Sequence, residues 1–364
     1  MRPGARTRSL VAALFATIAL AGCKLRRDAM PDDRDDRRTV AEIARRAVER
    51  VEGELAASPP ADPASAPPQV DADVLLAHEV DALVRECRNP FATRIAQSWV
   101  RYSSWLGDAK NGPTGHERTV LGLYAITADP KSCRKAVDAA KALAPATPAL
   151  DLAAEAYASA LEALVPVVDA ASLYYEHGEY KDDDFARGRA LHPDLVAAFD
   201  AFRKADAALA AQLDAAQDGL DARELARLAG DEQQRGRWHL KRTAVLAKEV
   251  LRAGSFDVAK IDVAALSAAE QRFEDARLAF ARWCEAHPTD AALDASYLRE
   301  LQQLDLAARE LVARARDRRP YTLGERMNLG GWNEWMVAGS PGRLAARYDA
   351  VIEAFNAIGA ATPR

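Results

Sequence analysis

The segment of the chain richest in chemically capable side chains runs from Tyr174 to Pro193. It begins YYEHGEYKDDDF, whose five acidic side chains supply the oxygen ligands that a hard cation such as Ca²⁺ takes, roughly six to eight at a time. The spacing fits no EF-hand loop, and Lys181 stands among the acids. We therefore expect a solvated loop between two helices, in which an acidic side chain caps the segment at Phe185.

Two histidines flank this loop, and a pair of imidazoles can contribute to a zinc site. His192 is followed by Pro193, a pair typical of the start of a helix, so we expect no metal there. A ligand or partner bound at this segment would meet its aromatic, imidazole and carboxylate groups. These candidate contacts are Tyr174, Tyr175, His177, Tyr180, Asp182, Asp183, Asp184 and His192.

A second aromatic segment reads LGGWNEW and places Trp332 and Trp335 beside two glycines and an asparagine. Aromatic loops can bind sugars, peptides or lipid headgroups, because a ring offers flat apolar area next to a polar group. They also close the open end of a helical bundle as a hydrophobic plug. We favour the plug and keep both tryptophans as candidate interaction residues.

Motifs of known catalytic sites are missing from the sequence, which has no HExxH, GxSxG, GxGxxG or P-loop. Glycoside hydrolysis needs two carboxylates at a fixed separation across a cleft, and 54 acidic residues cannot be sorted by spacing alone. There is no long basic stripe and the formal net charge is −5, which argues against a nucleic-acid partner. We expect no cofactor and no enzymatic activity.

The cysteines predict one disulfide. Cys87 lies at the expected end of a helix, just before Asn89-Pro90, and Cys133 lies near the start of another. Helix ends joined by turns can bring two Cα atoms within disulfide range. We predict that Cys87 pairs with Cys133 and that Cys284, on an apolar helix face, stays free and buried. Three unpaired thiols are the alternative. No cysteine lies in a CxxC spacing that would indicate structural zinc.

The N-terminus is typical of an exported protein. Three arginines precede an apolar run of eleven residues, Leu10 to Leu20, which is too short to span a membrane. The run ends in LAGC, which resembles the lipobox cut by the lipoprotein signal peptidase. We predict that residues 1–22 are a bacterial lipoprotein signal peptide and that Cys23 becomes the lipid-bearing first residue.

Residues 23–72 are predicted to be a tether. They contain a mixed-charge run and the spacer SPPADPASAPPQ, a composition typical of a semi-rigid linker. The protein would then face the periplasm from a membrane to which the lipid on Cys23 holds it. Lys24 is not the aspartate that favours retention in the inner membrane of enteric bacteria, so we favour the outer membrane.

The remainder, 73–364, has the composition of an all-α domain. Alanine is the best helix former and recurs throughout, and apolar residues follow 3-4 spacings typical of core-facing helices. We predict an elongated antiparallel helical bundle. The expected helices are 73–88, ended by Asn89-Pro90; 91–109; 149–175; 193–254, whole or broken at a glycine; one opened by a capping box at Ser267–Glu270; 293–316; and one opened by Ser340-Pro341.

Two stretches resemble a known family. They are YYEHGEYKDDDFARGRALHP at 174–193 and GSPGRLAARYDAVIEAFN at 339–356. Both are similar to the YiiG-like lipoproteins, DUF3829, which pair a lipoprotein signal with an all-helical domain. This chain departs from the family pattern in its N-terminal third, where Trp99 and Tyr102 replace asparagine-rich helices, and at Asp349. The resemblance implies a fold and a location but no established activity or catalytic residue.

Together these features suggest a lipid-anchored, non-enzymatic interaction or binding module, whose envelope partner, protein or glycan, is unknown. A hydrolase acting on envelope glycans is one alternative. A protein that binds a metal or small ligand through residues 176–192 is another.

Overall fold

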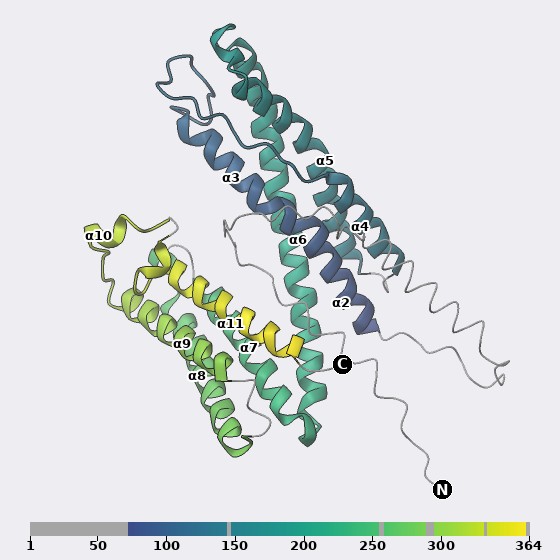
Figure 1. The fold of residues 1–364 in the computed structure, drawn as a ribbon, viewed down its shortest axis with the longest axis vertical. Coiled ribbons are helices and arrows are strands. Elements are labelled where there is room, and N and C mark those ends of the chain that lie inside the picture. The colour runs from purple at the N-terminus through teal and green to yellow at the C-terminus, as the bar shows by residue number, and fades with distance from the viewer. Residues whose placement is uncertain (1–71, 144–146, 255–257, 289–294, 331–332, 362–364) are drawn as a thin grey trace, which may run out of the picture. The chain divides into compact units, whose positions relative to one another are not determined.

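The computed structural model describes residues 72–361, apart from 144–146, 255–257, 289–294 and 331–332 (Figure 1). The predicted signal peptide, the lipid-bearing Cys23, the tether and Trp332 lie outside the described residues. Within them the protein is all-α, as the sequence predicts, and contains no strand. The α-helices are α2 (Ala72–Ala82), α3 (Asn89–Trp105), α4 (Pro130–Leu143), α5 (Pro148–Glu176), α6 (Ala186–Ala229), α7 (Arg235–Ala253), α8 (Val263–Ala286), α9 (Ala295–Arg316), α10 (Leu323–Arg326) and α11 (Pro341–Ala361).

The predicted helix end at Asn89-Pro90 is wrong, because the chain passes from α2 into α3 through a π-helical segment, Leu83–Arg88. There the backbone N–H of Asn89 bonds the carbonyl of Val84, five residues earlier. The proline follows in the first turn of α3 and lacks the N–H that would bond a carbonyl of the preceding turn. The wider π turn thus carries the helix past a residue that normally ends one.

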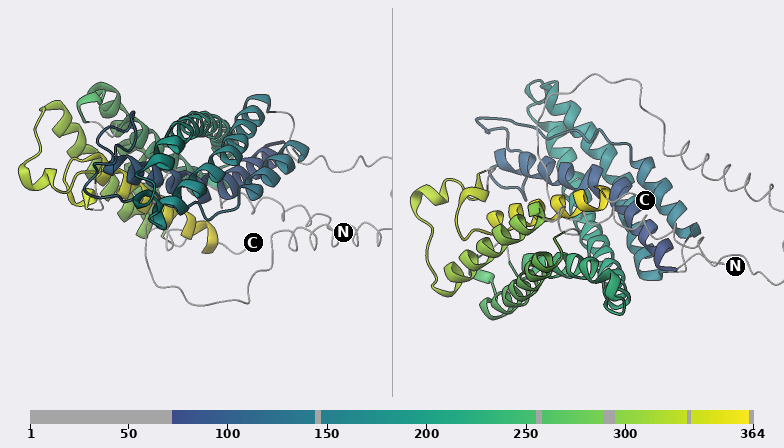
Figure 2. Two further views of the ribbon diagram at one scale, coloured as in Figure 1. Left: turned by 90° about the horizontal axis from the view of Figure 1, so that it is seen from above. Right: turned by 60° about the horizontal axis from the view of Figure 1, so that its bottom comes forward.

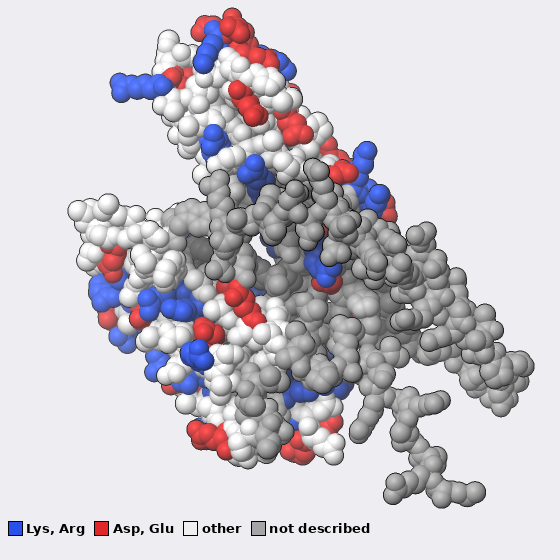
Figure 3. All heavy atoms as spheres, in the orientation of Figure 1, with Lys and Arg blue, Asp and Glu red and all other residues white. Residues whose placement is uncertain are grey.

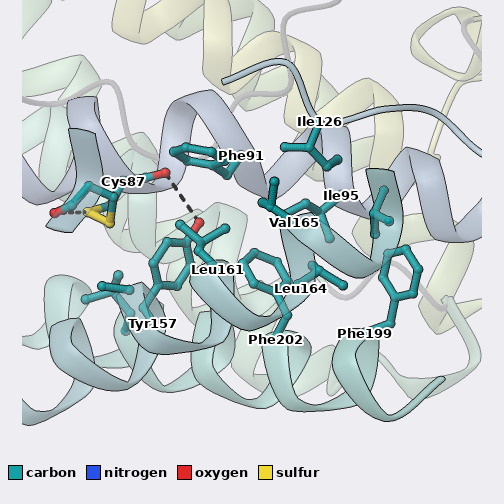
Figure 4. Packing of buried hydrophobic residues seen from close by; sticks show 14 of the residues in the cluster. Cys87, Phe91, Ile95, Ile126, Tyr157, Leu161, Leu164, Val165, Phe199 and Phe202 are labelled. Carbon is teal, nitrogen blue, oxygen red and sulfur yellow. Dashed lines mark hydrogen bonds between the residues drawn. A yellow bond between two sulfur atoms is a disulfide. The ribbon is translucent and has the colours of Figure 1, made fainter. Parts of the chain in front are cut away.

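The first hydrophobic core lies between α3, α4, α5 and the N-terminal half of α6. Figure 4 shows Phe91, Leu161 and Phe202 packed together beside the disulfide that joins Cys87 to Cys133. The hydroxyl of Tyr157 donates a 3.3 Å hydrogen bond to the carbonyl of Cys87. The disulfide therefore ties the π segment to α4 at the edge of this core.

Helix α5 is the one helix among those described whose length and composition would suit a membrane span. Its apolar positions Leu161, Leu164 and Val168 are instead fully buried in the first core. The helix is therefore explained by packing against α6.

The expected helix 193–254 is two helices. The first, α6, already begins at Ala186 and ends at Ala229, and Gly230 and a short 3-10 turn separate it from α7. The two helices run antiparallel. Their pairing is shown by the Lys241 ammonium of α7, which lies 2.8 Å from Asp221 and 2.9 Å from Glu224 on α6. The chain reverses after Gly230, in a turn where Asp231 accepts a hydrogen bond from the N–H of Gln233. Of the two predicted alternatives, a whole helix or one broken at a glycine, the structure has the broken helix.

The second core is formed by α7, α8, α9 and α11, which pack side by side (Figure 2). Its largest buried side chains include Phe273, Phe280, Tyr297 and Phe355. The predicted capping box at Ser267–Glu270 is wrong: α8 begins at Val263, capped by Asp262, which accepts from the N–H of Ala265 at 3.0 Å. The start of α11 is as predicted, with Ser340 Oγ accepting from the N–H of Arg343 at 3.1 Å.

Candidate functional site

The acidic loop at 176–184, predicted to be a solvated loop between two helices, is a hydrogen-bonded turn between α5 and α6. Asp183 Oδ1 accepts from the Tyr174 hydroxyl at 2.8 Å, and Asp183 Oδ2 accepts from the backbone N–H of Arg187 at 2.9 Å. Loss of solvent alone raises the pKa of Asp183, but these hydrogen bonds outweigh it and hold the pKa below its usual value. The acidic cap expected near Phe185 is therefore the carboxylate of Asp183, and both of its oxygens accept hydrogen bonds within the turn.

The backbone of the same turn is unusual. Gly178 has φ +73°, and Asp184 and Phe185 have φ of 50° and 61°, in the left-handed region that non-glycine residues rarely adopt. The ring of Phe185 is buried and lies 4.9 Å, centroid to centroid, from that of Tyr180. The buried Phe185 directly precedes Ala186, where α6 begins, so the helix starts earlier than the His192-Pro193 pair suggested.

His192 belongs to an aromatic cluster rather than to a metal site. Its Nδ1 lies 2.9 Å from the Tyr102 hydroxyl and its Nε2 lies 3.3 Å from the carbonyl of Lys110. A neutral imidazole protonated on Nε2 satisfies both contacts, accepting from the tyrosine and donating to the carbonyl. Tyr175 packs beside Tyr102 and edge-on to Trp105 at 5.2 Å between ring centroids.

Residues 106–129, which have no regular secondary structure, cover this cluster. Two glycines at positive φ allow the close approach: a Cβ on Gly112 would lie 2.6 Å from Cγ of His192, and one on Gly122 would lie 2.9 Å from Cβ of Tyr175. The indole N–H of Trp105 donates to the carbonyl of Gly122 at 3.0 Å. Sequence reasoning missed this cover, for which the glycines were the only signal.

The two tyrosines of the cluster offer little acid–base chemistry near neutral pH. Burial raises the pKa of Tyr102 to about 12 and also raises that of Tyr175. Both phenols therefore stay protonated over the physiological range. His177 is exposed and lies 3.7 Å from Glu179, while Asp182 and Asp184 are exposed on the turn. Across the described ranges, no three His, Cys, Asp or Glu side chains are grouped to hold a metal ion.

A buried acid pair lies elsewhere in the first half of the chain and was not expected. Glu79 on α2 is only 3% exposed and faces Asp151 on α5, and Thr147 Oγ1 donates to Glu79 Oε2 at 3.4 Å. Burial, together with the negative charge of Asp151, raises the pKa of Glu79 to about 7. A lone Glu on a helix gives no sequence signal of such a pairing.

The segment between α9 and α11 is held by a buried arginine. Arg314 is 1% exposed, and its Nη2 bonds Glu325 Oε1 at 2.5 Å and the Ala338 carbonyl at 2.8 Å. Its guanidinium also lies over the Tyr321 ring, 4.1 Å from the centroid. The backbone N–H of Thr322 and the charge of Arg314 hold the pKa of Glu325 at about 2. One cation thus fixes residues from both ends of the segment.

Glu334 fixes the far side of the same segment. Its carboxylate accepts from the N–H of Gly330 at 2.9 Å and from that of Gly342 at 2.8 Å, and its carbonyl accepts from the Ser340 hydroxyl. The backbone of this segment is therefore well bonded in the described residues around α10.

Apolar side chains nevertheless point out of this segment. The exposed fractions are 72% for Leu323, 81% for Met327, 48% for Trp335 and 50% for Met336, and we call these four residues the apolar surface. Figure 3 shows the area over α10 drawn largely white. The hydrophobic plug expected of this loop is wrong for Trp335, because half of its side chain faces solvent.

Comparison with known proteins agrees with the fold and leaves the activity open. Residues 82–357 match the family described as "Protein of unknown function (DUF3829)". The chain is 32% identical over 298 residues to the "Uncharacterized protein YiiG" of Escherichia coli strain K12, covering 80% of this chain and 82% of that protein. No solved structure matches the chain. On the extent of the family match and the identity to YiiG, the protein belongs to the YiiG-like DUF3829 family.

Proposed function

We propose that the protein is a lipid-anchored, non-enzymatic helical module that faces the periplasm and binds a component of the cell envelope through its apolar surface. The observation that carries the proposal is the exposure of Leu323, Met327, Trp335 and Met336 on a segment whose backbone is held by Arg314 and Glu334. A group of exposed apolar side chains on a fixed segment is typical of an interaction site, because a monomeric soluble domain rarely keeps such a patch in water.

The way in which the other candidate residues are used supports a binding role. Asp183 is committed to the α5–α6 turn and His192 to the aromatic cluster, and the phenols of Tyr102 and Tyr175 stay protonated. The hydrogen bonds of Asp183 and His192 thus hold parts of the fold together, as we expect of a module that binds rather than catalyses. The lipobox at Cys23 supplies the second element of the proposal, a membrane anchor in the same chain.

Site-specific photocrosslinking in cells tests the proposal. A photoreactive amino acid replaces Met327 in the lipidated full-length chain, and a matched variant carries it at Leu152, which is 74% exposed on α5. We expect a defined crosslink from position 327 and none from 152. Equal products at both positions would show that the crosslinks do not arise from binding at the apolar surface. The absence of any product at either position, to protein or to lipid, would show that this surface binds nothing in the envelope.

A further inference from the structure

The apolar surface is a local concentration of exposed hydrophobic side chains. Four of the ten large apolar side chains that are exposed in the described part of the chain lie between residues 323 and 336. The other six are single positions spread over the earlier helices and loops, from Val100 to Leu306, which is normal for a soluble domain. The four exposed side chains on one fixed segment are unusual for a soluble domain, and they indicate a surface that a binding partner covers.

The charges beside this surface are basic. Arg316, Arg318, Arg319 and Arg326 are all exposed on the segment and its approach from α9. The carboxylates within the segment are already occupied: Glu325 pairs with buried Arg314, and Glu334 accepts backbone N–H groups. Asp317 pairs with Arg316 at 2.8 Å. Exposed guanidinium groups therefore outnumber exposed carboxylates on this segment and its approach.

We propose that the apolar surface docks onto a bilayer of anionic phospholipid. This inference rests on the proposed function and specifies its binding partner. Tryptophan is enriched at the membrane interface, methionine and leucine enter its acyl boundary, and arginine binds phosphate through paired N–H groups. The four side chains and the arginines near them in the sequence are the residue types that such an interface takes.

The predicted lipid anchor would bring the apolar surface closer to a bilayer than to any freely diffusing protein. A lipid on Cys23 would keep the domain at a membrane, and the 49 residues from Cys23 to Asp71 span at most ~170 Å when extended. Such a tether holds the apolar surface at a high effective concentration near the bilayer, so that weak partitioning suffices. A lipid and a basic apolar surface together then act as the two signals that stable attachment requires.

Vesicle binding of a non-acylated chain isolates the surface from the anchor. The probe is the chain from residue 23 to 364 with Cys23→Ser, sedimented with vesicles of phosphatidylglycerol and phosphatidylethanolamine or of phosphatidylcholine alone. We expect binding to the anionic vesicles that weakens as salt is raised. The double change Met327→Ser with Trp335→Ser should lower the partition coefficient by about tenfold or more.

Matched variants separate the two contributions. Arg318→Gln with Arg319→Gln should lower binding to the anionic vesicles by roughly tenfold and leave binding to phosphatidylcholine unchanged. Leu152→Ser, which removes an equally exposed leucine from α5, should leave both unchanged. All these side chains are exposed, and circular dichroism of each variant checks that the helices remain.

Three results would overturn the inference. The chain does not sediment with anionic vesicles, or the Met327 and Trp335 changes leave sedimentation unaltered, or Leu152→Ser weakens it as much. If the chain does not sediment with anionic vesicles while position 327 crosslinks to a protein in cells, the proposed function stands and the partner is that protein. If both experiments fail, the proposed function falls as well.

Discussion

The Tyr174 hydroxyl donates a 2.8 Å hydrogen bond to Asp183, nine residues further along the chain. The other oxygen of that carboxylate accepts from the N–H of Arg187 in the first turn of α6. One side chain thus joins the last turn of α5 to the first turn of α6. The segment 174–193 thus reverses the chain direction between two long helices.

Removing this carboxylate should destabilise the fold. Asp183→Ala loses the cap of α6 and leaves the buried hydroxyl of Tyr174 without its acceptor, so we expect a clear loss in the free energy of unfolding. Asp182→Ala, at the exposed neighbouring position, should change it by less than ~0.5 kcal/mol. Urea denaturation followed by circular dichroism measures both, and equal effects would contradict the assignment.

The same geometry predicts that the turn does not bind metal tightly. Asp183 is committed to its two hydrogen bonds, and Asp182 and Asp184 are exposed without a third acid grouped beside them. Titration calorimetry with Ca²⁺ and with Zn²⁺ should give no stoichiometric heat. A site that disappears when Asp182 and Asp184 are changed together to Asn would prove this wrong.

Local patterns predicted much of the fold. The 3-4 spacing of Leu161, Leu164 and Val168 indicates a core-facing helix, and these residues are fully buried. Ser340 before Pro341 marks a helix start because a side-chain cap and a missing N–H act within one turn. Such signals depend only on neighbours in the sequence, which is why they succeed.

Features that depend on distant residues could not be predicted. The acid pair of Glu79 and Asp151 joins two helices 72 positions apart, and no spacing rule relates them. Arg314 is the buried centre of the α9–α11 segment, and nothing in its sequence neighbourhood distinguishes it from the exposed arginines that follow it. The helix through Asn89-Pro90 was missed because a π turn, itself set by packing, overrides the local preference of proline.

The lipid anchor is tested directly at Cys23. Cys23→Ala removes the only thiol in the predicted lipobox, so the variant should take up no label from a palmitate analogue while the wild-type chain does. Comparable labelling of the two proteins would contradict the prediction. Fractionation of the labelled wild type then tells outer from inner membrane, of which we expect the outer.

The disulfide should contribute strongly to stability. It closes a loop of 46 residues between Cys87 and Cys133, which the chain-entropy account converts to about 4 kcal/mol. The double variant Cys87→Ala with Cys133→Ala should therefore unfold at clearly lower urea, and adding a reductant should not lower it further. Cys284 is the remaining free cysteine in the described residues, so alkylation of the unfolded, unreduced domain should modify that thiol.

The acid pair predicts an unusual dependence of stability on pH. The pKa of Glu79 is about 7 in the folded protein, above its ordinary value of 4.5, so the folded chain keeps a proton that the unfolded chain has lost between these values. The free energy of unfolding should then fall as the pH rises through this window and level off above it.

Glu79→Gln should remove that slope. The amide stays neutral and can donate to Asp151 as the protonated acid does, so the variant should be more stable than the wild type by ~1 kcal/mol or more at pH ~8 and about equal to it at pH ~4. Asp151→Asn, which removes the neighbouring charge, should shift the midpoint of the slope to lower pH. Glu176→Gln, at an exposed position on α5, should keep the wild-type profile. Urea unfolding across this pH range measures these profiles. If the free energies of unfolding of the wild type and of Glu79→Gln depend on pH in the same way, Glu79 is ionised in the folded protein and its pKa is not raised.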